Sequence, residues 1–148
     1  MTLTWTLTPF LSKLPLLLHV AVESAAATSF ICKPSSQIKD PSLEVQLVLQ
    51  SLGGSLLSTN LVSLVFIFRP EFDTTSRLVA ASLASWHLWP MRRAWVRLSI
   101  AAAGNGVKEK KQTRGSQDPV VFGGPSVHLA IHAALFISLL GSAIIGSS

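Results

Sequence analysis

The sequence predicts a mainly α-helical, small integral membrane protein with two transmembrane helices and flexible polar linkers; a third helix at the N-terminus is an alternative. Two observations predict this class. Only 13% of the 148 residues are charged and 49% are hydrophobic, whereas about a quarter of a soluble domain is charged. The chain therefore has little from which to build a charged coat in water. The charges also leave long gaps, because residues 45–68 and 119–148 carry none.

Residues 1–30 have two interpretations. Leu14–Val22 forms a short apolar core, and the small residues Ala25–Ala27 follow it, as in a secretory signal peptide. A basic stretch before the core is missing, and two prolines interrupt the segment. A first membrane segment is therefore an equal alternative. The next stretch, residues 31–46, is rich in Ser, Pro and Lys and is expected to be a polar linker.

Residues 47–68 are the first candidate transmembrane helix, because they are uncharged and long enough to cross the hydrocarbon core. Asn60 lies well inside this stretch, and an amide in lipid requires a hydrogen-bond partner on another helix. Arg69 and Pro70 follow directly, and a proline restricts the residue before it to extended backbone. The helix is therefore expected to end at residue 68.

Residues 69–126 are expected to form a basic cytoplasmic loop. Nine of the 12 Lys and Arg residues lie here, and the positive-inside rule places such a loop in the cytoplasm and the C-terminus on the far side. Within this loop, residues 86–103 are expected to form a segment at the membrane interface, since Trp favours the membrane surface and the Arg side chain extends to lipid headgroups. The side chains expected at the interface are Trp86, Trp89, Arg92, Arg93, Trp95 and Arg97. Nucleic acid is a disfavoured partner, because no nucleic-acid motif surrounds these arginines.

Residues 127–146 are the second candidate transmembrane helix. Twenty uncharged residues form a helix of about 30 Å, which matches the bilayer core. Ten of them are Val, Leu, Ile or Phe, which together favour insertion by about 3 to 6 kcal/mol. A stripe of small residues at a spacing of four predicts a face for close helix packing. This stripe consists of Ala130, Ala134, Ser138, Ser142 and Gly146.

The sequence predicts no catalytic site, metal site or cofactor. His128 and His132 share one helix face, but Leu129 stands where the zinc-protease motif has its Glu. We interpret this spacing as chance. A single cysteine, Cys32, cannot form an internal disulfide. Acidic residues are too scattered to indicate a paired-carboxylate site, and phosphate-loop and nucleophile-elbow motifs are absent from the sequence.

The predicted function is association with the lipid bilayer, with other transmembrane helices or with a second copy, in a membrane that the sequence does not specify. One alternative is a secreted or GPI-anchored protein, because small residues near Gly115 precede the apolar C-terminal tail. Another is the product of a non-functional or recently arisen open reading frame. The absence of Tyr and the disagreement among local signals favour that interpretation.

Overall fold

The computed structural model describes residues 4–38, 40–104 and 124–146, and within them the chain is almost entirely helical. The elements are α1 (Thr4–Cys32), the short 3-10 turn η1 (Pro34–Ser36), α2 (Leu43–Phe68), α3 (Thr74–Gly104) and α4 (Gly124–Ile145). The mainly α-helical class is confirmed. Three segments are long and apolar enough to cross a membrane: Phe10–Cys32 in α1, all of α2 and all of α4. The N-terminal segment thus supplies a third helix of this kind.

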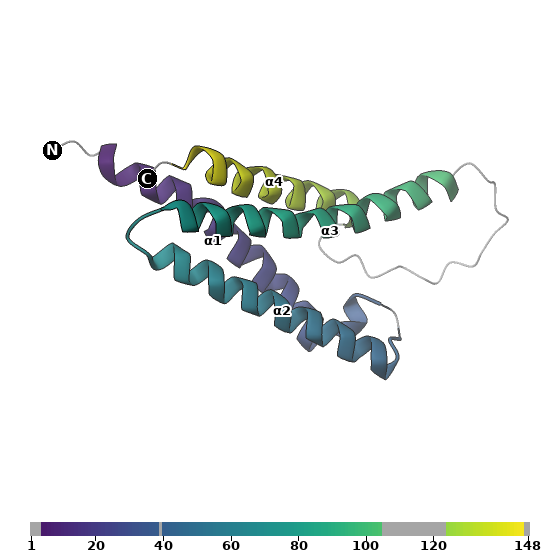
Figure 1. Ribbon diagram of the computed structural model, residues 1–148. Helices are drawn as coiled ribbons and strands as arrows, with labels where there is room; N and C mark the ends of the chain where they lie inside the picture. Colours follow the sequence, from purple (N-terminus) through teal and green to yellow (C-terminus); the bar gives the residue numbers. More distant parts are fainter. Residues whose placement is uncertain (1–3, 39, 105–123, 147–148) are drawn as a thin grey trace.

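The helices form two antiparallel pairs (Figure 1). In one pair α1 packs along α2, in the other α3 packs along α4, and α1 also contacts α4. The start of α1, the α2–α3 connection and the end of α4 lie at one end of the bundle. The α1–α2 connection, the end of α3 and the start of α4 lie at the other end (Figure 1).

The helix ends follow local sequence signals. Ser42 caps α2, since its hydroxyl accepts a hydrogen bond from the backbone N–H of Val45 at 3.4 Å. As predicted, α2 ends at Phe68, directly before Arg69 and Pro70. The side chain of Asp73 accepts from the backbone N–H of Ser76 at 2.9 Å and so caps the start of α3.

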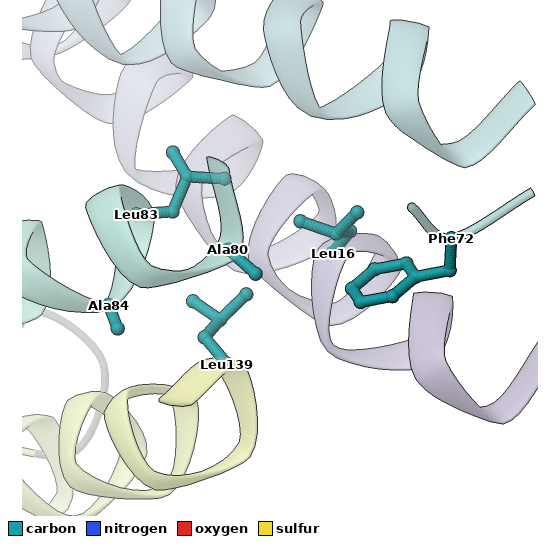
Figure 2. Close-up of a cluster of buried hydrophobic side chains, with 6 residues drawn as sticks. All are labelled: Leu16, Phe72, Ala80, Leu83, Ala84 and Leu139. Atoms are coloured by element: carbon teal, nitrogen blue, oxygen red, sulfur yellow. The ribbon is translucent and has the colours of Figure 1, made fainter. Parts of the chain in front are cut away.

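Two apolar clusters form the core, one toward each end of the bundle. The first, shown in Figure 2, joins α1, α3, α4 and the α2–α3 connection through Leu16, Phe72, Ala80, Leu83, Ala84 and Leu139. The second joins α1 to α2 through Ala27, Phe30, Leu49 and Leu56. On the buried face of α1, His19 and Glu23 lie between the residues of these two clusters. Polar side chains therefore occupy the middle of the bundle.

The structure shifts three of the predicted boundaries. The expected linker over residues 31–46 is shorter, because α1 continues to Cys32 and α2 begins at Leu43. Residues 74–104 form one helix, whereas the sequence indicated a helix only after Pro90. This helix forms because its small residues pack along α4, and that contact compensates for an internal proline. The basic positions Lys108, Lys110, Lys111 and Arg114 of the expected loop lie outside the described residues.

Candidate functional site

All four histidines of the chain lie close to Glu23 in the middle of the bundle. His19 and Glu23 come from α1, His87 from α3, and His128 and His132 from α4. His19, Glu23, His87 and His132 are buried, with exposed fractions of 0 to 4%. We call these four residues the histidine–glutamate cluster. Ionisable side chains inside a bundle of apolar helices are costly and mark functional sites more often than packing.

Hydrogen bonds connect the three buried histidines across three helices. Nε2 of His87 lies 3.1 Å from Nδ1 of His19, and Nδ1 of His87 lies 2.8 Å from Nδ1 of His132. Each contact needs one proton between two ring nitrogens. His87 is therefore the central member of the cluster, and its tautomer is coupled to those of both neighbours.

Glu23 faces the same histidines but makes no hydrogen bond through one of its oxygens. Its Oε1 lies 3.6 Å from Nδ1 of His87 and 3.8 Å from Nδ1 of His132. This oxygen and Nε2 of His19 are both buried without a hydrogen-bond partner. An unpartnered carboxylate oxygen is expensive to bury, so a cation or a proton donor is expected beside Glu23.

A cavity of about 230 Å³ opens beside the cluster and is lined by residues of all four helices. Glu23 and His132 form part of its wall, together with Trp86, Arg93 and His128. The guanidinium of Arg93 donates to Nε2 of His128 at 3.2 Å. The cavity therefore has an apolar lining with a few convergent polar groups, as ligand sites do.

The cluster contains the atom types that bind transition metals. His19, Glu23 and His87 each offer one ligand atom, and these atoms lie within 4.8 Å of one another. Imidazole nitrogens and carboxylate oxygens are ligands of zinc. Chemically, the cluster can either hold a divalent cation or share protons along the three histidines.

Most of the predicted interfacial side chains are exposed, and three of the six line the cavity. Trp89 and Trp95 are 67% and 64% exposed, and Arg92, Arg93 and Arg97 are exposed as well. Trp86, Trp89 and Arg93 line the cavity. The exposed side chains are accessible enough for headgroup contact, and contact with lipid stays a prediction.

The predicted small-residue stripe does not form one continuous buried face. Ala130 and Ala134 are exposed, Ser138 and Ser142 are half-buried, and Gly146 is buried. A side chain at Gly146 would meet the Phe72 ring, with the nearest ring carbon 2.6 Å from the added Cβ. The C-terminal end of the stripe therefore packs within the bundle, while its N-terminal end is free to meet another helix.

Sequence reasoning missed three members of the cluster: His19, Glu23 and His87. It weighed His128 and His132 as a pair on one helix, and the structure joins only His132 to the buried cluster. One signal was present, since Glu23 is the only charged residue between Lys13 and Lys33 and follows His19 by one helical turn. An acid in an apolar helix indicates a partner inside the bundle.

Comparison of the chain with protein-family models, with curated proteins and with solved structures finds no match.

Proposed function

We propose that the chain is an integral membrane protein that acts through association with lipid and with other helices, without catalysis. One observation carries this proposal: large apolar side chains cover the outside of the bundle, while ionisable side chains lie inside it. Large apolar side chains such as Leu61, Val65, Ile137 and Ile144 are more than 60% exposed, whereas the histidine–glutamate cluster is buried. An extended exposed apolar surface needs a partner, and lipid is the partner that fits helices of 22 to 26 residues.

The polar interior supports the same proposal. Asn60 on α2 donates to the hydroxyl of Ser24 on α1 at 3.0 Å, which confirms the predicted interhelical partner of Asn60. Helices in lipid cannot associate by the hydrophobic effect, so interhelical hydrogen bonds and close packing hold them together. The buried polar residues of this bundle serve that role in the proposal.

Lipid contact at the membrane surface is assigned to the outer face of the second half of α3. Trp89 and Trp95 are exposed beside Arg92 and Arg97, and indole and guanidinium groups favour the headgroup region. Anionic lipid would add favourable electrostatic contacts with these arginines.

The packing of α4 bears on the GPI-anchor alternative, in which the apolar tail would be removed. Leu139 of α4 is fully buried against Leu16 and Ala80, and His132 belongs to the buried cluster. Removal of α4 would expose both the apolar core and the cluster. The packing therefore favours a protein that retains this helix.

Membrane insertion of the full chain tests the proposal. We expect the protein to stay in the pellet after alkaline carbonate extraction and to resist release by a phosphatidylinositol-specific phospholipase. In a translocon insertion reporter carrying residues 127–146, Leu139→Arg is expected to cost about 2.5 to 3.5 kcal/mol, because the charge is at the helix centre. The control Ile145→Arg is expected to cost far less, since a terminal arginine reaches the headgroups.

Three outcomes contradict the proposal. Release into the carbonate supernatant would remove the membrane assignment, and release by the phospholipase would support the GPI-anchored alternative. Failure to detect the endogenous protein in cells that contain its transcript would support the non-functional reading frame.

A further inference from the structure

Three ligand atoms of the histidine–glutamate cluster form a compact triangle. Nδ1 of His87 and Nδ1 of His132 are 2.8 Å apart, and Oε1 of Glu23 lies 3.6 and 3.8 Å from them. A point about 0.7 Å above the plane of these atoms lies about 2.1 Å from each, and Zn–N and Zn–O bonds are about 2.0–2.2 Å long. The triangle therefore has about the size of one face of a zinc coordination tetrahedron, and the two nitrogens need to separate by about half an ångström to reach tetrahedral spacing.

We propose that Glu23, His87 and His132 bind one Zn²⁺ ion between α1, α3 and α4. Two neutral imidazoles and one carboxylate are a ligand set that zinc accepts with a fourth position left open. The oxygen of Glu23 that lacks a hydrogen-bond partner gains the ion as its partner. The ring that carries the shared proton on Nδ1 must carry it on Nε2 when the ion binds, so both imidazoles stay neutral and each Nδ1 lone pair is free for the metal.

The fourth coordination position faces the cavity. Both Glu23 and His132 line it, and its volume of about 230 Å³ accommodates several water molecules or a small ligand. Arg93 lies in the same wall. A water molecule or a small anion therefore completes the coordination, and an anion would also offset the positive charge of the ion and of Arg93.

His19 supports the site without binding the ion. When Nδ1 of His87 binds zinc, its Nε2 carries the remaining proton and donates to Nδ1 of His19 at 3.1 Å. Ligating histidines almost always donate their second N–H in this way, which fixes the tautomer and the ring orientation. One ring cannot bind one ion through both nitrogens, so His19 and His132 lie on opposite sides of His87.

This proposal replaces the expectation from sequence that the chain has no metal site. That expectation was based on a single helix, on which His128 and His132 are the only candidate ligands. The structure adds ligand atoms from α1 and α3, and it turns Nε2 of His128 toward Arg93 instead. Zinc is preferred over hard cations because nitrogen ligands favour borderline metals, whereas Ca²⁺ and Mg²⁺ prefer oxygen.

The test is metal binding by the full chain, purified without a histidine tag in detergent micelles and stripped with a chelator. We expect one Zn²⁺ per chain after back-titration and no displacement by excess Ca²⁺ or Mg²⁺. Co²⁺ in place of zinc should give the visible absorption of a tetrahedral site with nitrogen and oxygen ligands. Glu23→Gln, His87→Gln and His132→Gln should each abolish stoichiometric binding.

Two further variants separate the roles. Glu71→Gln, at an exposed position of the α2–α3 connection, is the matched control for Glu23→Gln and should bind zinc as the wild type does. His19→Gln should keep the stoichiometry but weaken affinity by about 10- to 100-fold, as loss of a supporting hydrogen bond does. Helicity by circular dichroism and elution volume show whether each variant keeps the fold.

Several outcomes would overturn the proposal. A wild-type chain that binds no zinc, or a cobalt spectrum without tetrahedral bands, refutes the site independently of any variant. Stoichiometric zinc in the double variant H87Q/H132Q refutes the assigned ligands. If His19→Gln abolishes binding while His132→Gln retains it, the ion lies on the other side of His87 and the assignment is wrong.

Discussion

Asp73 connects the two helix pairs through three contacts in the α2–α3 connection. Its Oδ1 accepts from both the backbone N–H and the hydroxyl of Ser76, each at 2.9 Å, and its Oδ2 accepts from the guanidinium of Arg69. The two hydrogen bonds from Ser76, and then the positive charge of Arg69, lower the pKa of the Asp73 carboxyl below its ordinary value. The ionised form of Asp73 is thus the one that holds α3 in place.

This lowered pKa predicts loss of stability on acidification. A carboxyl whose pKa is lower in the folded state stabilises it above the ordinary value of about 4 and loses that contribution as the pH falls through the folded pKa. Asp73→Asn should lower the thermal midpoint in detergent at neutral pH, and the difference in midpoint from wild type should close as the pH falls through the folded pKa of Asp73. Thermal unfolding followed by circular dichroism measures this difference in midpoint. The exposed Glu71→Gln in the same connection is the control, and a gap that stays constant with pH would contradict the capping role.

The close approach of α1 and α2 depends on a glycine. A Cβ added at Gly53 would lie 2.6 Å from Cγ1 of Ile31 and 3.1 Å from the backbone oxygen of Ala27. The neighbouring Gly54 has open space around it, with nothing within 4 Å of an added Cβ. Two adjacent glycines therefore differ in role, and only the first allows the two backbones to approach.

This difference predicts opposite tolerance at the two positions. Gly53→Leu should destabilise the α1–α2 pair by about 1–3 kcal/mol, because the side chain displaces a packed helix. Gly54→Leu should be neutral or slightly stabilising, since it adds helix propensity and meets no neighbour. The unfolding free energy in detergent measures both. Equal effects of the two substitutions would show that α1 does not pack on α2 in this register.

The same elements show how far the sequence predicts the fold. The C-terminal end of α2 and the approximate extent of α4 follow from local signals, namely Arg69 and Pro70 after one helix and an uncharged run in the other. The full length of α3 does not follow from local signals. Its four arginines and Pro90 are unfavourable signals for a long helix, and packing along α4 stabilises it. The candidate site could not be predicted either, since His19 and His87 are 68 positions apart and meet only through helix packing.

The two ends of the bundle differ in charge. Lys13 donates to the backbone oxygen of Arg69, and Arg77 donates to that of Ala143 at 2.7 Å. These three basic residues lie at the end of the bundle that holds the start of α1 and the end of α4. Toward the other end lie Lys33 and the three arginines of the second half of α3. The sequence between α3 and α4 adds four more basic residues, Lys108, Lys110, Lys111 and Arg114.

The positive-inside rule then assigns an orientation that differs from the one the sequence indicated. The more basic end, with the α1–α2 connection, is expected in the cytoplasm, and both termini are expected on the far side. Because α3 runs antiparallel to α4, its two ends lie at opposite ends of the bundle (Figure 1). If α3 crosses with its neighbours, residues 69–73 and residues 105–123 face opposite sides of the membrane. A single cytoplasmic loop over residues 69–126 would instead place both on one side.

Single cysteines on a Cys32→Ser background distinguish these arrangements. With an impermeant thiol reagent on intact cells, Glu71→Cys and Ser148→Cys should be labelled, and Gln112→Cys should be labelled only after permeabilisation. Protection of both Glu71→Cys and Gln112→Cys with labelling of Ser148→Cys would mean that α3 does not cross and that the single loop is correct. Labelling of Gln112→Cys on intact cells, with protection at the other two positions, would reverse the orientation, because the basic end would then lie outside.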